Sequence, residues 1–293
     1  MSNGKVIVRL FGGLGNQMFI YAAGKSLALR NDSEFIIDYT TGFKGDIYKR
    51  HFELDNFNIT AKFTSKVQCF DYKGGSYIRH VSNKIGRHIP LLNIKIIKEN
   101  NFEFNNNFFL NKNKNCLLEG YWQTERYFMD YSDIIKKDFL IIKGMSYSVN
   151  NEAKSIDELG DRTIALGVRR YQEVKTFVNI KLTDKEYYLQ AMKIMAQKVK
   201  DPIFICFTQD PNWVEENLCQ DFDVRFAIQK DQDSGAIEDL FLIRRCKHFI
   251  ISNSTFYWWG AWLAENKNKI VITPNNWVNQ DTAPPDWTVL SEI

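Results

Sequence analysis

Short apolar runs alternate with longer amphipathic segments along most of this chain. The clearest run, residues 163–168, has the length and composition of a buried strand. The segment that follows has apolar residues at helical spacing, and we predict that its core face includes Tyr188, Ala191, Met195 and Val199. Strands that alternate with helices of this length indicate a parallel sheet covered on both faces.

The same pattern extends through the rest of the chain. In the C-terminal half it predicts strands at 202–207, around 224, at 248–252 and at 270–273, with helices at 213–218, 237–245 and 255–265. In the N-terminal half it predicts a strand at 6–11, a glycine turn, a helix from Asn16 to about Arg30, and strands at 35–38 and 116–119. Residues 39–114 show few clean periods, so we expect irregular loops and short helices there.

The chain is longer than a single hydrophobic core usually supports. Its 293 residues predict two domains. The polar stretch 143–160 is the best candidate for a linker, because it is rich in Ser, Asn, Asp and Gly. We therefore predict one domain at residues 1–150 and a second at 151–293, and we leave open that the last residues pack back on the first domain.

Composition narrows the class of partner. The net charge of +3 is too even for a protein that holds nucleic acid mainly by electrostatics. The five cysteines are scattered without the spacing of a zinc or redox pair, which is typical of a reducing compartment. No segment approaches the roughly 18 apolar residues of a membrane-spanning helix. We expect a cytosolic protein, and peripheral contact with a membrane surface is left open, as is its oligomeric state.

Two adjacent arginines follow the clearest strand. Arg169 and Arg170 stand where that strand meets solvent or a cleft, so they outline an anion site; a pair of solvated surface charges is the alternative. Successive strand residues point to opposite faces, so at most one of the two faces a given pocket. We expect the other to pack against a neighbour or to pair with a second charge.

Two predicted helix starts have the chemistry of a phosphate cradle. The first follows Gly12-Gly13-Leu14-Gly15, and the second follows Ser252-Asn253-Ser254-Thr255. Glycines allow close backbone approach, hydroxyls donate hydrogen bonds, and a helix start presents amides to an anion. The alternatives are a tight turn without ligand and a simple helix cap. We expect Trp258, Trp259 and Trp262 in the core.

Other polar clusters have less specific patterns. Asp38 and the segment 120–124 each follow a predicted strand, where α/β sheets place ligand contacts, although the aromatic rings of 120–124 fit a core equally well. Two Asp-x-Asp pairs lack a third ligand, and we interpret both as solvated loop acids: Asp221 and Asp223, and Asp231 and Asp233. With no metal predicted, arginine has to supply positive charge for a diphosphate.

Three stretches together resemble the bacterial α-1,2-fucosyltransferase family: residues 8–19, the twin-arginine stretch and residues 252–263. Residues 120–128 and 238–248 are also similar to it. The resemblance implies an α/β fold of the GT-B type, with two Rossmann-like domains facing a cleft, the first on the acceptor side and the second binding the GDP-sugar. It also implies GDP-fucose as donor, inversion at the anomeric carbon, and no metal or other cofactor.

The resemblance also assigns roles to individual residues. It puts the donor diphosphate on Arg169, with Arg170, Asn253, Ser254 and Thr255 in the same binding site. Asp239 is expected to read the guanine edge. Gly13 and Asn16 of the first domain are expected near the phosphate and the transferred sugar.

One motif departs from the family pattern. The family reads His-x-Arg-Arg-x-Asp, whereas here the first position is Gly167 and the last is Gln172. The motif therefore leaves open which residue recognises the guanine base and which residue acts as the general base. Glu173 is our hypothesis for the missing carboxylate, and an unchanged pH–rate profile in Glu173→Gln would remove that role.

The predicted activity is transfer of fucose to a hydroxyl, galactose O2, of a glycan acceptor that belongs to a surface polysaccharide or a lipid-linked glycan. The alternatives are transfer of another sugar from a related nucleotide donor, and a non-catalytic protein that binds a GDP-sugar or a glycan.

Overall fold

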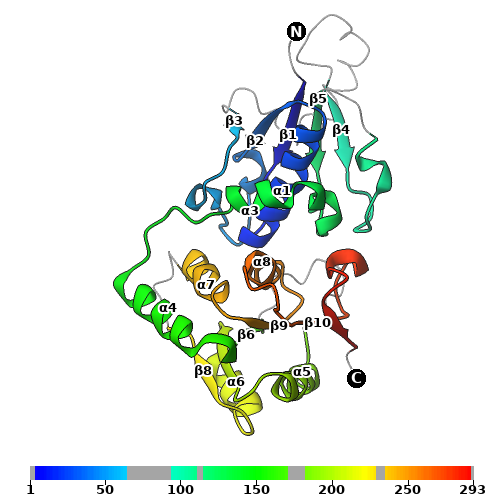
Figure 1. Ribbon diagram of the computed structural model, residues 1–293. Helices are drawn as coiled ribbons and strands as arrows, with labels where there is room; N and C mark the ends of the chain where they lie inside the picture. Colours follow the sequence, from blue (N-terminus) through cyan, green and yellow to red (C-terminus); the bar gives the residue numbers. More distant parts are fainter. Residues whose placement is uncertain (1–3, 65–93, 111–114, 171–181, 229–234, 292–293) are drawn as a thin grey trace, which may run out of the picture. The chain divides into compact units, whose positions relative to one another are not determined.

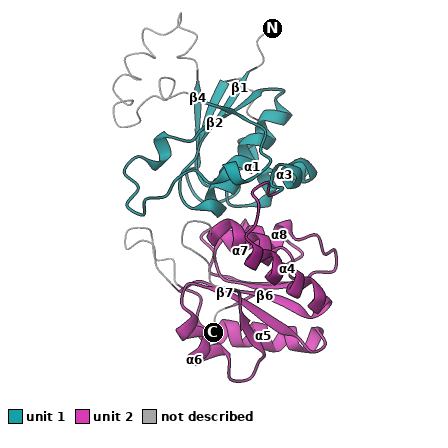
Figure 2. Cartoon of the chain, turned by 90° about the vertical axis from the view of Figure 1, so that its left-hand side faces the viewer, with its two compact units in different colours: residues 1–140 teal, residues 141–293 magenta. Residues whose placement is uncertain are grey.

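The computed structural model describes residues 4–64, 94–110, 115–170, 182–228 and 235–291. The chain divides into two compact units, residues 1–140 and 141–293 (Figure 2).

The prediction of a linker at 143–160 is wrong, because helix α4 (Tyr147–Leu159) occupies most of it. Three apolar residues at helical spacing, Val149, Ala153 and Ile156, are buried there, and Ser146 caps the helix by accepting from the Val149 amide. The division of the chain falls before this helix, at 140/141.

The first unit is built on a parallel sheet with strand order β3-β2-β1-β5-β4 (Figure 1). Its helices include α1 (Leu14–Arg30) and α3 (Ser132–Asp138), and its strands are β1 (Lys5–Arg9), β2 (Glu34–Asp38), β3 (Lys62–Phe63), β4 (Lys95–Lys98) and β5 (Asn115–Glu119). Helix α1 begins at Leu14, two residues before the predicted start. Strands β3 and β4 lie within the stretch that we expected to be irregular. Both are edge strands of two and four residues, too short and too polar to show a period.

The second unit has a six-stranded parallel sheet, in the order β11-β10-β9-β6-β7-β8. Its strands are β6 (Thr163–Val168), β7 (Ile203–Thr208), β8 (Val224–Phe226), β9 (His248–Ile251), β10 (Val271–Pro274) and β11 (Thr288–Leu290). Read from β6, this is the 3-2-1-4-5-6 order of the Rossmann fold. The helices that connect the strands include α5 (Lys185–Lys198), α6 (Pro211–Leu218), α7 (Gly235–Ile243) and α8 (Thr255–Leu263). Strand β11 was not predicted, and it places residues 288–290 in the second sheet.

Helices cover both faces of this second sheet. On one face, α5 buries the four residues predicted from its periodicity, Tyr188, Ala191, Met195 and, just after its end, Val199, against strand side chains such as Leu166. On the other face lies α8. Its three tryptophans are core residues, as predicted, with Trp258 and Trp262 stacked at 5.9 Å between ring centroids.

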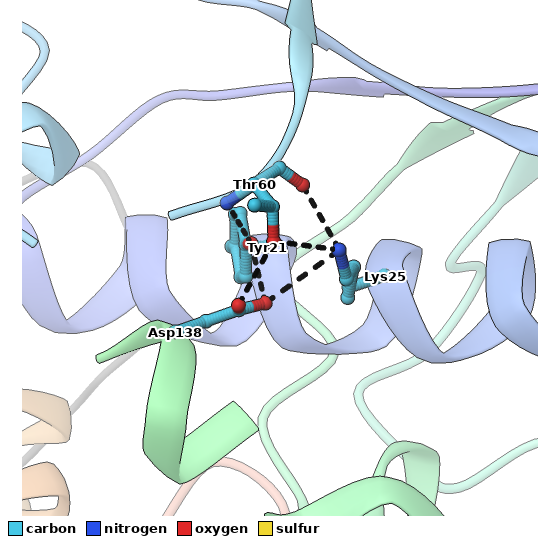
Figure 3. Close-up of polar contacts among 4 residues, drawn as sticks. All are labelled: Tyr21, Lys25, Thr60 and Asp138. Atoms are coloured by element: carbon cyan, nitrogen blue, oxygen red, sulfur yellow. Dashed lines mark hydrogen bonds and ion pairs between the residues drawn. The ribbon is translucent and has the colours of Figure 1, made fainter. Parts of the chain in front are cut away.

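A buried polar network joins α1 to α3 in the first unit (Figure 3). The hydroxyl of Tyr21 donates to Asp138 Oδ2 at 2.7 Å, and the hydroxyl of Thr60 donates to Asp138 Oδ1 at 3.0 Å. Lys25 Nζ donates to the Thr60 carbonyl at 2.9 Å and lies 3.7 Å from Asp138 Oδ2. Burial, followed by the charge of Asp138, raises the pKa of Tyr21 well above its usual value. One carboxylate therefore ties three segments of the first unit together.

His248, at the amino end of β9, links β9 to β10 and makes stability depend on pH. Its Nδ1 accepts a hydrogen bond from the Ile270 amide at 3.1 Å, and burial lowers the pKa of the imidazole. When a group has a lowered pKa in the folded state, the unfolded chain takes up the proton first, so stability is lost as pH falls below about 6.5. We expect wild type to be more stable than His248→Gln above that pH and to lose this advantage below it. Urea unfolding at several pH values measures the difference, and a constant difference would contradict the prediction.

Candidate functional site

Each sheet has one point at which the strand order reverses, between β1 and β5 in the first unit and between β6 and β9 in the second. In open α/β sheets ligands bind outside the carboxyl ends of the strands at such a point. In the second unit, Gly167 of β6 pairs with Ile251 of β9, and the Ser252 amide donates to the Gly167 carbonyl at 3.1 Å. The residues that follow these strands, the twin arginines and the Ser252–Thr255 segment, therefore start side by side.

Arg170 is held by packing on the α5 side of the sheet. Its guanidinium lies over the Trp213 ring, 4.0 Å from the centroid, and Nη1 donates to the Thr183 carbonyl at 3.1 Å. The Thr183 hydroxyl in turn donates to Asn253 Oδ1 at 3.3 Å. This confirms the prediction that one of the two arginines packs against a neighbour. It also connects the twin-arginine segment to the segment after β9.

Arg169 follows Val168, whose side chain is buried on the α5 face among the core residues of that side. The alternation of side chains along an extended segment directs Arg169 to the opposite face, the one that α8 covers. The Arg169 side chain is partly buried. Continued past the end of β6 at Val168, this alternation predicts that the two guanidinium groups lie on different faces of the sheet.

Helix α8 begins beside this arginine segment. Ser254 is its N-cap residue in extended conformation, but the Ser254 side chain makes no capping hydrogen bond. The Trp258 amide donates to the Ser254 carbonyl at 3.0 Å, and Thr255 is the first helical residue. The positive end of the helix dipole therefore lies at the edge of the sheet where Arg169 emerges.

The absence of a side chain at Gly167 has a direct structural reason. A Cβ atom placed on Gly167 would lie 2.6 Å from Cγ of the Tyr257 ring, far inside van der Waals contact. The Tyr257 hydroxyl donates to the Phe207 carbonyl at 2.8 Å and lies 3.5 Å from the Val168 carbonyl. Tyr257 of α8 thus fills the volume that a side chain at position 167 would enter.

Two further tyrosines lie under the same edge on the α5 face. The Tyr187 hydroxyl donates to the Ile251 carbonyl at 2.6 Å and is 3.1 Å from the Ile272 carbonyl. Tyr188 is fully buried, and burial raises the pKa of its hydroxyl, opposed by the nearby Ser252 hydroxyl and the Arg169 backbone. Buried tyrosines thus brace the strand ends from both faces.

The remaining predicted residues of the second unit are placed as follows. Asp239 lies on α7 and is partly exposed, next to the buried Glu238. Helix α7 packs on α8, where Gly260 lets Ile243 approach closely. Glu173 lies outside the described residues.

In the first unit the glycine turn lies at the end of β1. Gly12 has φ +78°, a conformation that favours glycine, and Gly13 is the N-cap residue of α1. Asn16 Oδ1 accepts from Gln123 Nε2 at 3.0 Å. Since Gln123 follows β5, this hydrogen bond spans the point where the strand order reverses.

Gln17, in the first turn of α1, contacts the glycine turn and is not among the residues predicted from the sequence. It is fully buried; its Nε2 donates to the carbonyls of Gly12 at 3.0 Å and His51 at 2.8 Å, and its Oε1 accepts from the Glu53 amide at 3.0 Å. Both the nitrogen and the oxygen of the Gln17 side-chain amide are hydrogen-bonded, so Gln17 fixes the shape of the turn. An amide next to the apolar core face of a helix, directly after glycines, was the available signal.

The segment after β5 divides between core and polar positions. Trp122 is 1% exposed and packs against Phe108 and Tyr127, so its role is in the core. Glu99 accepts hydrogen bonds from the backbone amides of Tyr121 at 2.6 Å and Trp122 at 3.1 Å. Burial raises the pKa of Glu99, and these hydrogen bonds oppose the shift.

The acidic candidates have ordinary partners where they are described. Asp38 accepts from the Thr40 and Thr41 amides, both at 3.0 Å, and so closes the turn after β2. Asp223 pairs with Arg225 at 3.1 Å, and Asp231 and Asp233 lie outside the described residues. In the part of the chain that the structure describes, no group of three or more His, Cys, Asp or Glu side chains is arranged to hold a metal ion. No helix among the described residues is long and apolar enough to cross a membrane.

Comparison with solved structures supports the fold. The structure resembles fucosyltransferase NodZ from Bradyrhizobium, with TM-score 0.52 and 15% identity over 90% of this chain and 94% of that chain. It also resembles an Arabidopsis thaliana FUT1 mutant in complex with GDP, with TM-score 0.51 and 12% identity over 92% of this chain and 70% of that chain. Both similarities concern the α/β GT-B fold alone.

Sequence comparison extends over nearly the whole chain. An O-antigen biosynthesis glycosyltransferase, WbnK, from Escherichia coli is 31% identical over 92% of this chain and 93% of its own length. An alpha-1,2-colitosyltransferase from Escherichia coli is 27% identical over 96% of this chain and 97% of its own length. A shorter match, 35% identity over 82 residues, joins 28% of this chain to 22% of mouse galactoside alpha-(1,2)-fucosyltransferase 1. Residues 5–290 match Glycosyl transferase family 11, and the chain is therefore a glycosyltransferase that belongs to this family.

Proposed function

We propose that this glycosyltransferase transfers fucose from GDP-fucose to galactose O2 of a glycan acceptor, with inversion at the anomeric carbon and without a metal ion. The observation that carries the proposal is the juxtaposition of the twin-arginine segment and the start of α8 at the carboxyl ends of β6 and β9. Guanidinium groups and helix amides are the groups that bind a diphosphate. The related proteins named above include α-1,2-linking transferases.

The residues divide into roles under this proposal. Arg169 binds the diphosphate, and Ser254 and Thr255 at the start of α8 contact it. Arg170 and Asn253 complete the donor site through their connection by Thr183. Asp239 reads the guanine edge.

The first unit contributes Gly13 and Asn16 under the same proposal. The glycine turn allows close approach of a ligand to the backbone, and the Gln123 hydrogen bond orients the Asn16 amide. Glu173 remains the hypothesised general base.

The chemistry is a single displacement. The acceptor hydroxyl attacks C1 of fucose while the bond from C1 to the phosphate oxygen breaks, GDP departs with the electron pair, and the hydroxyl proton passes to the base. The transition state resembles an oxocarbenium ion, so negative charge develops on the leaving phosphate. Arg169 stabilises that charge and supplies the positive charge that a metal ion provides in other transferases.

A second donor is favoured by one specific finding, the full-length similarity to an alpha-1,2-colitosyltransferase. Colitose is fucose without the hydroxyl at C3. A site that hydrogen-bonds a sugar hydroxyl rejects the analogue lacking it by about 10⁴–10⁵-fold, whereas an apolar site discriminates weakly. The donor sugar is therefore decided by groups around C3.

The deciding experiment offers GDP-fucose and GDP-colitose separately to a β-galactoside acceptor, with and without EDTA, and analyses the product by NMR. We expect an α-1,2-linked fucoside in equal yield with EDTA. If product forms with GDP-colitose and not with GDP-fucose, colitose replaces fucose as the transferred sugar. If EDTA abolishes activity and Mg²⁺ restores it, the reaction is not metal-independent.

A further inference from the structure

Gly167 and Tyr257 occupy one volume at the edge of the second sheet. Gly167 is the penultimate residue of β6, and Tyr257 stands in the first turn of α8. A Cβ on Gly167 would lie within 2.6 to 2.9 Å of three ring atoms of Tyr257. Real Cβ atoms do not come so close to a ring, so the ring fits only because residue 167 has no side chain. The two residues form a matched pair.

The Tyr257 hydroxyl also makes a hydrogen bond to the neighbouring strand β7. It reaches across β6 to the penultimate residue of β7 and donates to the Phe207 carbonyl at 2.8 Å, with the Val168 carbonyl 3.5 Å away. A hydroxyl has one proton, so the shorter contact is the hydrogen bond and the longer one is a weak contact. Tyr257 therefore joins the start of α8 to the carboxyl ends of two strands.

The hydrogen bond of Tyr257 lies next to both of the proposed phosphate-binding elements. The Val168 carbonyl belongs to the peptide bond whose other half is the Arg169 amide. Tyr257 lies two residues after Thr255, the first residue of α8. The ring and hydroxyl thus fix the distance between the two elements to which the proposed function assigns the diphosphate.

We propose that Tyr257 is a positioning residue for the donor diphosphate, acting together with Gly167. It is 3% exposed, so it acts through Arg169 and the start of α8 rather than by touching the ligand. This inference rests on the proposed function. It also explains the glycine at position 167. The volume that a side chain there would need is occupied by Tyr257 of α8, the helix whose start is the second phosphate-binding element.

The first test is Tyr257→Phe, which keeps the ring and removes the hydroxyl. Loss of one such hydrogen bond is expected to raise the Kd for GDP and the donor KM about tenfold, with acceptor KM unchanged. A purely structural role would lower the amount of folded enzyme and leave both constants as they are. The matched control is Thr163→Val, which removes a buried hydroxyl that donates to the Gly160 carbonyl at 2.9 Å, at the opposite end of the same strand. It is expected to lower the melting temperature and to leave Kd and KM at the wild-type values.

The second test uses the pairing. Gly167→Ala forces the methyl group against the ring and is expected to weaken GDP binding at least about tenfold, since overpacking shifts the backbone. Adding Tyr257→Ser removes the ring and makes room for the methyl group. If the two residues act as a pair, the double variant binds GDP more tightly than Gly167→Ala alone, and the single effects are not additive.

Calorimetry with GDP tests the proposed donor and the positioning role of Tyr257 separately. If wild type does not bind GDP, the proposed donor is wrong. If wild type binds GDP while Tyr257→Phe matches it in Kd and donor KM, or the double variant shows additive losses, the positioning role of Tyr257 is wrong and the proposed function stands.

Discussion

Arg169→Ala is expected to lower the rate of transfer about 10²–10³-fold, the usual loss when one preorganised charge donor is removed from a developing anion. Negative charge on the leaving diphosphate is small in the ground state and large in the transition state. Arg169 is partly buried and follows β6, whose end lies beside the segment that leads into α8, so its guanidinium is preorganised for that charge. The loss should therefore fall on kcat and on kcat/KM for the donor, with acceptor KM close to the wild-type value.

Steady-state kinetics with each substrate varied in turn measures this effect. The matched control is Arg225→Ala, because Arg225 lies in the same unit but pairs at the surface with Asp223, and both side chains are about half exposed. It should retain wild-type kinetics. Near-normal transfer by Arg169→Ala would remove Arg169 from the mechanism, and an equal loss in Arg225→Ala would show that the effect is not local.

Much of the second unit could be predicted because its strands are buried on both faces. Residues 163–168 form a mostly apolar run in which every residue is buried, and the strand has those bounds. Strands with little burial give no such signal. β11 has exposed or half-buried residues at all positions, and β4 begins with Lys95 and ends with Lys98. Pairing with a neighbouring strand, and not sequence pattern, therefore decides that these residues form strands.

The candidate site shows the same limit. Alternation along a strand predicts that one arginine leaves the pocket, but it does not identify Trp213 and Thr183 as the partners of Arg170. From the sequence alone, Gly167 is only a departure from the His-x-Arg-Arg-x-Asp pattern. Its explanation is a ring from Tyr257, 90 positions later along the chain, and such a contact exists only once the sheet has formed. Gln17 was missed for the same reason, since its partners include His51 and Glu53.

Asp138→Ala is expected to destabilise the first unit by about 3–5 kcal/mol, the range found when one partner of a buried charged group is removed. The substitution takes away the acceptor of Tyr21 and Thr60 and leaves the Lys25 ammonium, whose side chain is 12% exposed, without its carboxylate (Figure 3). Buried donors without an acceptor carry their full desolvation cost. Since proteins are stable by only about 5–15 kcal/mol, the effect should be visible as a large fall in the melting temperature.

The location of this loss distinguishes the network from a general defect. Hydrogen exchange should rise first in α1 and α3, which the carboxylate joins, while β6 and α5 of the second unit keep their protection. Asp130→Ala is the matched control: Asp130 pairs with Arg30 on the same helix α1 at 3.3 Å, but with side chains 66% and 45% exposed, and exposed pairs contribute only about 0–1 kcal/mol. If both variants melt within a few degrees of wild type, the network of Asp138 does not hold α1 in place, and contacts such as those of Gln17 hold the glycine turn at the start of that helix.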